Sequence, residues 1–278
     1  MSHHHGADFA DLSELDDHAL ATELARLAGE ALLSLRARAQ TEPGGRWTMK
    51  DDGDLLAHRL LMDALAVARP DDAVLSEEGR DHPARLRAER VWIVDPLDGT
   101  REFGEPPRVD WAVHVALWER SRPLGDADPA DDALRVGELT AGAVALPARR
   151  LVLSTGHPLP LPAACDFAPR LLVSRSRPHP LVTHRIAPAL DGELLPLGSA
   201  GAKAMAVALG EADVYAHAGG QYEWDSAAPV AVARAVGLHT SRLDGSPLVY
   251  NREDPYLPDL LICRPELAAP VLAALAVS

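Results

Sequence analysis

Residues 91–103 constrain this chain more than any other stretch. They read Val-Trp-Ile-Val-Asp-Pro-Leu-Asp-Gly-Thr-Arg-Glu-Phe, an apolar run that is cut off by Asp95 and Pro96. This pattern predicts a buried strand that ends where the aspartates begin, because proline interrupts a sheet. Asp95 and Asp98 then lie close together. Two carboxylates about 4 Å apart repel each other by roughly 1 to 4 kcal/mol, so a divalent cation with oxygen ligands is the natural partner between them.

Two other interpretations of these aspartates stay open at this level. Asp-Pro and Asp-Gly pairs also form plain turns at strand ends, with no ligand involved. An Asp-x-Asp-Gly-Thr motif at a strand end would instead indicate a phosphatase that works through a covalent aspartyl phosphate. Here two residues separate the aspartates instead of one, which disfavours the covalent mechanism.

The charge balance narrows the class of protein. Acidic residues outnumber basic ones 41 to 27, and the net charge of -14 argues against a nucleic-acid or anionic membrane partner. A small anionic substrate stays compatible, because bound metal ions reverse the local sign. No apolar run reaches the length of a membrane span, and the chain starts with no basic-then-apolar signal. Cys165 and Cys263 form no metal or disulfide pattern, which favours reduced thiols in a cytoplasmic protein.

The length of 278 residues allows two subdomains, and the sequence contains no internal repeat. The proline-rich segment 158–162 is the best candidate for a linker. We therefore predict a disordered tail over residues 1–12, an N-terminal α+β subdomain over 13–162 and a C-terminal α/β subdomain over 163–278. The tail includes three consecutive histidines, to which we assign no role. Residues 121–138 mix Pro, Gly and Asp and predict a surface loop.

Helical periodicity predicts two helices near the start of the chain. Residues 13–16 form a capping-box pattern before the first helix, which a Pro-Gly-Gly break at 43–45 ends. The second helix is expected to begin near Asp52, so that Asp54 lies in its first turn. A carboxylate in a first turn also simply favours the helix dipole.

Strands are predicted at 73–75, 111–117 and 141–145. The first of them runs directly into Ser-Glu-Glu-Gly, which contains Glu77. Adjacent glutamates are more often solvated surface than ligands, so this pair by itself indicates no site.

Further polar residues follow predicted elements in the second half. Ser174 and Arg175 come directly after a strand and can hold a phosphate or form a hydrophilic loop. Ser199 is a good N-cap for the next helix, and Lys203 either is solvated or reaches an anion at the start of that helix. Asp225 is a plausible N-cap of a later helix, which is the alternative to a role as a ligand.

Four motifs then occur in order: Ser-Glu-Glu-Gly, Asp-Pro-Leu-Asp-Gly-Thr-Arg-Glu-Phe, Gly-Ser-x-x-x-Lys and Trp-Asp-Ser-Ala-Ala. Their combination resembles the inositol monophosphatase superfamily of metal-dependent, lithium-sensitive phosphatases over about residues 50–255. Within it, the chain is most similar to the CysQ type, the adenosine 3′,5′-bisphosphate phosphatases of sulfate assimilation. Gly-Thr-Arg-Glu-Phe, Val-Ser-Arg-Ser from Val173, Gly-Ser-Ala-Gly-Ala-Lys and Asp-Gly-Ser-Pro-Leu-Val-Tyr-Asn ending at Asn251 carry this narrower likeness. The resemblance implies an α/β fold, a layered α/β/α/β/α sandwich with the active site between its halves, and a homodimer.

The resemblance also implies a site. It holds two or three Mg²⁺ ions, with Mn²⁺ as a possible substitute. The implied metal ligands are Glu77, Asp95, the carbonyl of Leu97, Asp98 and Asp225. Asp54 and Thr100 orient the attacking water, and Glu77 completes the catalytic residues. The implied substrate contacts are Gly99, Thr100, Ser174, Arg175, Ser199, Lys203 and His217, with the amides of Gly99 and Thr100 cradling the phosphate.

We therefore predict hydrolysis of a small phosphorylated substrate, adenosine 3′,5′-bisphosphate, to AMP by metal-activated water. Alternatives are a broad inositol or sugar phosphate phosphatase, and a phosphatase specific for a nucleoside or cyclitol phosphate of one pathway. The interpretation as a non-catalytic metal- or nucleotide-binding regulator is weaker, because every carboxylate that the chemistry needs is present. Two positions depart from the pattern. The usual threonine-containing lead-in before Asp54 is missing, and His217 stands where such nucleotide phosphatases commonly carry arginine, which favours a sugar or inositol substrate.

Overall fold

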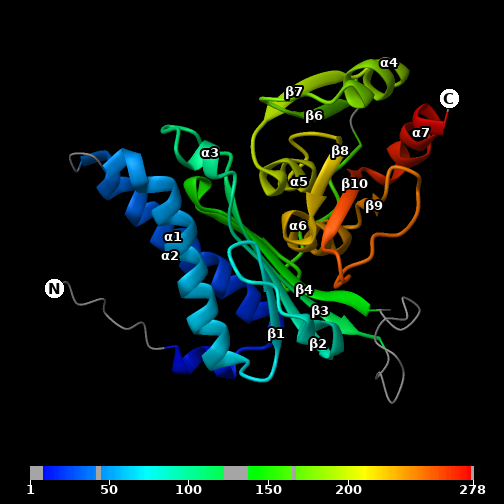
Figure 1. The fold of residues 1–278 in the computed structure, drawn as a ribbon. Helices are drawn as coiled ribbons and strands as arrows, with labels where there is room; N and C mark the ends of the chain where they lie inside the picture. Colours follow the sequence, from blue (N-terminus) through cyan, green and yellow to red (C-terminus); the bar gives the residue numbers. More distant parts are fainter. Residues whose placement is uncertain (1–8, 42–44, 122–136, 165–166, 277–278) are drawn as a thin grey trace.

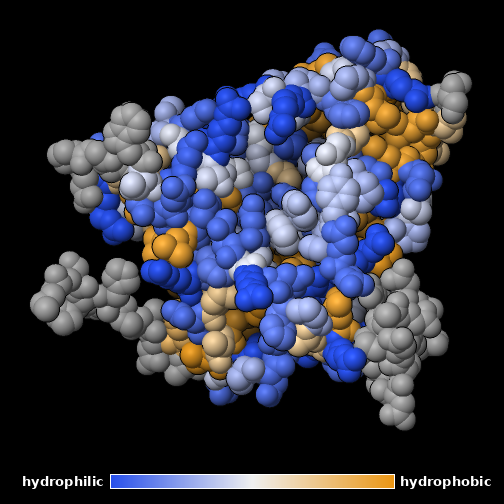
Figure 2. All heavy atoms as spheres, viewed as in Figure 1, coloured by the Kyte–Doolittle hydropathy of each residue, from blue (hydrophilic) through white to orange (hydrophobic). Residues whose placement is uncertain are grey.

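The computed structural model describes residues 9–41, 45–121, 137–164 and 167–276. They form two five-stranded sheets with helices outside and between them, so the layers alternate α/β/α/β/α (Figure 1). This is the layered sandwich that the resemblance implies. On the face shown in Figure 2, hydrophilic residues spread across the middle of the molecule, and hydrophobic residues gather near its C-terminal helix.

The first sheet has the strand order β1-β2-β3-β4-β5. Its strands are β1 (Ala73–Ser76), β2 (Arg90–Asp98), β3 (Ala112–Arg120), β4 (Gly137–Leu146) and β5 (Leu151–Ser154). β1 and β2 are parallel, and the other neighbours are antiparallel. The apolar run at the start of β2 is buried on both faces, as its near-continuous hydrophobic sequence requires.

β2 does not end at Asp95, as the sequence predicted, but continues to Asp98. Its pairing with β3 shifts register between Asp95 and Asp98. Proline cannot donate to a neighbouring strand and is tolerated at such irregularities, so Pro96 distorts the strand without stopping it. The distortion turns the end of the strand and both aspartates toward the middle layer.

Helices α1 (Asp17–Thr41) and α2 (Gly45–Ala68) cover the outer face of the first sheet. The predicted capping box is wrong, because Asp16 caps α1 by accepting a hydrogen bond of 2.8 Å from the amide of Ala19. α2 begins at Gly45 and not near Asp52, so Asp54 lies inside the helix and not in its first turn. The Asp-rich stretch resembles a helix start, but the preceding residues continue the same helix.

The second sheet has the order β7-β6-β8-β10-β9. Its strands are β6 (Arg170–Ser174), β7 (Glu193–Leu197), β8 (Val214–Tyr222), β9 (His239–Ser241) and β10 (Tyr256–Cys263). Helices α5 (Ala200–Ala208) and α6 (Glu223–Val236) lie between the two sheets, where α6 packs on β2, β3 and β4. Helices α4 (Ala187–Ala189) and α7 (Pro265–Ala276), with the helical turn Val182–Ile186, cover the outer face. The middle helices carry mostly small residues, which lets the two sheets approach each other.

Three predictions concern segments outside these elements. Residues 1–8 and 122–136 lie outside the described residues, so the tail is described only from Phe9 and the predicted loop at 121–138 only at its ends. The prediction of a disordered tail is wrong for the last residues of that segment, because Ala10–Glu14 forms a 3₁₀ helix in which Leu12 is buried. Residues 158–162 lie between the last strand of the first sheet and the first strand of the second, and we propose the subdomain boundary there. None of the described helices is long and apolar enough to cross a bilayer.

Candidate metal centre and active site

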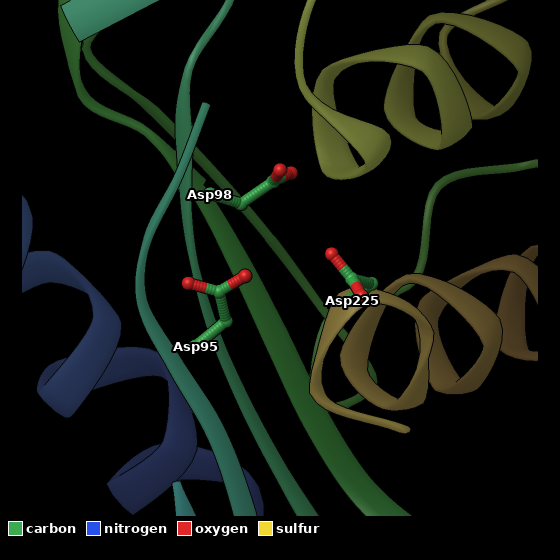
Figure 3. A group of neighbouring side chains, drawn as sticks. All are labelled: Asp95, Asp98 and Asp225. Atoms are coloured by element: carbon green, nitrogen blue, oxygen red, sulfur yellow. The ribbon is translucent and has the colours of Figure 1, made fainter. Parts of the chain in front are cut away.

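Three carboxylates meet in the middle layer. Asp95 and Asp98 project from the end of β2, and Asp225 projects toward them from the first turn of α6 (Figure 3). One oxygen of each lies within 4.8 Å of the others. Asp95 and Asp98 are buried, and Asp225 is half-buried. The sequence placed these residues in one site, and the structure brings them together from both halves of the chain.

Burial and mutual repulsion disfavour charge in this group. Burial, with Glu77 and Asp98 nearby, raises the pKa of Asp95 well above its ordinary value. Burial and Asp98 raise the pKa of Asp225 to about 6. Burial also raises the pKa of Glu77 to about 7, against the effect of its hydrogen bond to Asp95. A divalent cation among these oxygens would relieve the repulsion, and an all-carboxylate donor set suits a hard ion such as Mg²⁺.

Glu77 stands at the edge of the group. It follows directly on β1, and part of its surface is open to solvent while its carboxyl group is partly desolvated against Asp95. Its carboxylate reaches Asp95, but it is not one of the three residues whose oxygens lie within 4.8 Å. Glu77 is therefore placed to take part in a site that is centred on Asp95, from its solvent side.

Asp98 differs from its neighbours because donors surround it. Its carboxylate accepts hydrogen bonds from the hydroxyl of Ser199 at 2.5 Å and from the amides of Gly201 at 2.6 Å and Ala200 at 3.1 Å. Burial acts to raise its pKa, but His114, Ser199 and Gly201 outweigh burial and hold the pKa well below the ordinary value. Asp98 is thus a fixed anion at the start of α5. Ser199, expected to contact substrate, contacts this carboxylate.

Asp54 and Thr100 form a pair beside the three carboxylates. The hydroxyl of Thr100 lies 3.3 Å from Asp54 Oδ1 and 3.1 Å from the carbonyl of Leu97, and it can donate its single proton to either of these acceptors. The amide of Leu97 donates to Asp95 at 3.0 Å. Burial and the nearby Glu78 raise the pKa of Asp54 to about 6. A water molecule at this pair would find an acceptor and a hydroxyl next to the metal centre.

Gly99 explains how the chain turns at this point. It adopts a left-handed conformation with φ of 85° and precedes the short helix α3 (Thr100–Phe103). A Cβ atom there would lie 3.0 Å from the side chain of Ser199 and 3.3 Å from the carbonyl of Asp110. Only glycine combines this conformation with such close neighbours. The amides of Gly99 and Thr100 therefore lie at the turn between β2 and α3, beside Ser199 at the start of α5.

The residues that were predicted to contact a second phosphate do not all lie together. Ser174, Lys203 and His217 line one small cavity of about 40 Å³ between β6, β8 and α5. Arg175 instead forms ion pairs of 2.9 Å with Glu102 and Glu105, which link the end of β6 to α3 and the residues that follow it. A larger cavity of about 610 Å³ lies at the apolar surface beside α7, and none of the predicted site residues lines it (Figure 2).

Two residues of the small cavity between β6, β8 and α5 already form hydrogen bonds within the protein. Lys203 is buried and donates to the carbonyls of Gly198 at 2.6 Å and Ser199 at 2.7 Å, which leaves one N–H of its ammonium group for a ligand. His217 Nε2 lies 2.9 Å from the carbonyl of Gly220 and must donate to it. Burial lowers the pKa of His217, so its ring is neutral and Nδ1 remains an acceptor.

Sequence reasoning missed His114 and Tyr215. His114 is buried on β3, with Nδ1 at 3.0 Å from the carbonyl of Trp224 and Nε2 at 3.2 Å from Asp98. The hydroxyl of Tyr215 is buried in the same cavity as Lys203 and has no hydrogen-bond partner among the described residues. A histidine inside an otherwise apolar strand was the available signal for His114. No pattern distinguished Tyr215 from a core tyrosine.

Comparison with known proteins gives consistent matches along the whole chain. The model of the inositol monophosphatase family matches residues 11–276. A protein of Mycobacterium tuberculosis (strain CDC 1551 / Oshkosh) named 3′-phosphoadenosine 5′-phosphate phosphatase is 52% identical over 252 residues, which cover 90% of this chain and 89% of that protein. The 3′(2′),5′-bisphosphate nucleotidase CysQ of Escherichia coli (strain K12) is 31% identical, with 84% and 94% covered. The structure of CysQ from Bacteroides thetaiotaomicron superposes with a TM-score of 0.65 at 26% identity, over 88% and 95% of the two chains.

Proposed function

Because the chain belongs to the inositol monophosphatase family, we propose that it is a metal-dependent phosphatase that converts adenosine 3′,5′-bisphosphate to AMP and phosphate. The meeting of Asp95, Asp98 and Asp225 within 4.8 Å carries this proposal. The name of the relative from M. tuberculosis, at 52% identity, supports the choice of substrate.

Two or three Mg²⁺ ions would be held by carboxylates from both halves of the chain, and Mn²⁺ is a possible substitute. The proposed ligands are Glu77, Asp95, the carbonyl of Leu97, Asp98 and Asp225. Bound Mg²⁺ lowers the pKa of water and neutralises charge on the phosphoryl group. The buried oxygens fit this role, because they provide negative charge at high density with no lysine or arginine paired to Asp95 or Asp225 among the described contacts.

Asp54 and Thr100 would orient the attacking water. The Thr100 hydroxyl is directed to Asp54 and Leu97, so its oxygen can accept a hydrogen bond from one O–H of the water while Asp54 accepts a hydrogen bond from the other. The amides of Gly99 and Thr100 would donate to the phosphate that is cleaved. Water then attacks in line, the bond from phosphorus to the ribose oxygen breaks, and no phosphoenzyme forms.

The rest of the nucleotide would extend toward the cavity between β6 and β8. Ser174 and the free N–H of Lys203 would donate to the second phosphate, and the Tyr215 hydroxyl offers a further unused group. Arg175 would have to break its ion pairs with Glu102 and Glu105 before it could bind the phosphate. The cavity is small in the ligand-free chain, so this contact requires side chains around it to move.

A second candidate is a phosphatase for inositol or sugar phosphates, or for a nucleoside or cyclitol phosphate of one pathway. The observation that favours it is His217, which is neutral and presents an acceptor. A hydroxyl can donate to this acceptor, whereas a phosphate dianion cannot. On family resemblance alone, the proposal includes a homodimer and a cytoplasmic location.

The experiment that separates these candidates is Mg²⁺-dependent phosphate release from adenosine 3′,5′-bisphosphate, fructose 1,6-bisphosphate and inositol 1-phosphate. We expect kcat/KM for the nucleotide to exceed the others about 100-fold, which corresponds to roughly 2.7 kcal/mol of transition-state binding. A flat profile or a preference for the sugar would withdraw the nucleotide assignment and keep the metal chemistry. Asp95→Asn, which removes the charge of the central ligand, should show no turnover with any of the three.

A further inference from the structure

A buried arginine joins the two halves of the molecule. Arg85 lies in the 3₁₀ helix Pro83–Arg87, between β1 and β2, and is 2% exposed. Its guanidinium donates to both oxygens of Asp81, at 2.7 and 2.9 Å, and to Asn251 Oδ1 at 2.8 Å. The amide group of Asn251 donates back to the carbonyl of Arg85 at 3.3 Å. We call this contact the Arg85–Asn251 bridge.

Asn251 belongs to the other half of the chain and is itself held in place. It lies in the loop between β9 and β10, is 1% exposed and has a left-handed backbone with φ of 59°. Its amide and that of Arg252 donate to the two oxygens of Glu223, at 2.7 and 2.8 Å. Glu223 is the first residue of α6 and is 1% exposed.

Both ends of this connection lead to proposed metal ligands. Asp81 lies four residues after Glu77, in the segment that leaves β1. Glu223 lies two residues before Asp225 in the first turn of α6. The continuous path from Asp81 through Arg85, Asn251 and Glu223 therefore connects the segment that carries Glu77 to the helix that carries Asp225.

We infer that Arg85 and Asn251 are positioning residues, which set the placement of Glu77 relative to Asp225 and so tune the affinity for the divalent cation. The reason is electrostatic. Carboxylates that share a site repel one another, and without a cation only the surrounding structure holds them close. Outer partners of metal ligands typically change metal affinity 10- to 100-fold when they are removed. This inference rests on the metal centre of the proposed function and not on the identity of the substrate.

Asn251→Gly isolates the bridge with little other change. Glycine adopts the left-handed conformation without strain and keeps the backbone amide that donates to Glu223. Only the side-chain contact with Arg85 is removed. Arg85→Met is the second variant, because it deletes the same contact from the other side, although it also removes the hydrogen bond to the carbonyl of Glu253 at 3.4 Å and the ion pair to Asp81, which is 39% exposed.

The chain offers a matched control, which tests whether the loss of any contact between the two halves has the same effect. Arg149, in the short 3₁₀ turn between β4 and β5, pairs with Glu211, which follows α5, at 2.5 Å. The pair is partly exposed and takes no part in the contacts described for the metal centre. Arg149→Gln therefore removes an ion pair between the halves without touching the path to Glu77 and Asp225.

The test is Mn²⁺ binding by the whole protein without nucleotide, measured from the electron paramagnetic resonance signal of free Mn²⁺. We expect about tenfold weaker binding in Asn251→Gly and in Arg85→Met, no further loss in the double variant, and an unchanged affinity in Arg149→Gln. Turnover of Asn251→Gly should approach that of the wild type at saturating Mg²⁺, because the ligands themselves are intact.

Several results would overturn the inference. Wild-type affinity in Asn251→Gly would show that the bridge does not act on the metal, and an equal loss in Arg149→Gln would show general loosening. A wild-type protein that binds no Mn²⁺ would overturn the metal centre together with the bridge. A wild type that binds Mn²⁺ but does not prefer the nucleotide would contradict only the substrate assignment, and the expected binding pattern would still support the bridge.

Discussion

Thr100 shows how one hydroxyl can link a proposed metal ligand to the carboxylate that we propose orients the attacking water. It contacts Asp54 and the carbonyl of Leu97, and Leu97 in turn donates its amide to Asp95. A change at Thr100 therefore alters the water position without removing a metal carboxylate. This separates the two tasks of the site, holding the ion and aiming the nucleophile.

Thr100→Val should lower kcat about 100-fold with KM nearly unchanged, because it keeps the shape of the side chain and deletes the hydroxyl that orients water. Steady-state kinetics with the nucleotide at saturating Mg²⁺ measure this split. Thr100→Ser is the control, since it retains the hydroxyl and should stay within a few-fold of the wild type. A large rise in KM for Thr100→Val would indicate a role in binding and not in catalysis.

Mg²⁺ binding should release protons and become tighter as pH rises. Glu77 has a pKa of about 7 and Asp225 of about 6 in the metal-free chain, so both hold protons near pH 6 that the cation must displace. Above pH 8 both of these carboxylates are charged, so neither holds a proton that the cation must displace. The Kd for Mg²⁺ should therefore be at least about tenfold higher at pH 6 than at pH 8. Calorimetric titration at both values measures this, and equal affinities would contradict it.

The sequence was informative about Asp95 and Asp98 because a pair of aspartates at a strand end stands out locally, whereas Asp225 was implied as a ligand only by the family resemblance. Asp95, Asp98 and Asp225 were predicted as ligands, and the structure brings their oxygens together. The surroundings of Asp98 were not predictable in the same way. His114 reaches it from the neighbouring strand β3, and Ser199 and the amide of Gly201 reach it from the other half of the chain; such contacts depend on packing that no short pattern contains.

At the scale of elements, the start of α5 acts as a fixed donor surface. Ser199 has a positive φ of 27°, an uncommon conformation for a residue other than glycine. Lys203 holds this turn from within the helix by donating to the carbonyls of Gly198 and Ser199. The same turn presents the hydroxyl and amides that bind Asp98, so Lys203 supports the metal centre through the backbone.

Lys203→Met should lower the free energy of unfolding by roughly 1 to 3 kcal/mol, because two carbonyls lose a buried charged donor. Urea unfolding at pH 7 measures the loss. It should also raise KM for the bisphosphate more than for a monophosphate if the remaining N–H contacts the second phosphate. Unchanged stability with a selective rise in KM would mean that substrate contact is its only role.

Element boundaries were the least predictable part of the fold. The apolar and polar patterns identified β1, β2, β3, β4 and β6 and the helices α1, α2, α5 and α6, but no pattern predicted β5, β7, β9 or β10. The Asp-Asp-Gly-Asp stretch suggested a helix start near Asp52, yet α2 begins at Gly45. Packing of α2 against β2 and α1 outweighs such local signals, as does the continuation of β2 through Pro96.

At the scale of the molecule, the order of the layers creates the site. Asp95 and Asp98 come from the first sheet, and Asp225 comes from α6, which directly follows strand β8 of the second sheet. Ions held by all three would therefore connect the two halves of the chain. The layered architecture itself was implied by family resemblance, because strand order between distant segments leaves no signal in a single sequence.

Mg²⁺ should stabilise the folded protein, since the ligands come together only in the folded state. At a Mg²⁺ concentration 100 times Kd, the gain in free energy of unfolding is about 2.7 kcal/mol per independent site, visible as a rise in Tm over protein kept in EDTA. Asp95→Asn should abolish most of this rise. Without metal, however, Asp95→Asn should be at least as stable as the wild type, because it removes a buried carboxylate that Glu77, Asp98 and Asp225 repel. Calorimetric scans of both proteins with and without Mg²⁺ test this inversion. A metal-free variant clearly less stable than the wild type would mean that Asp95 supports the fold itself.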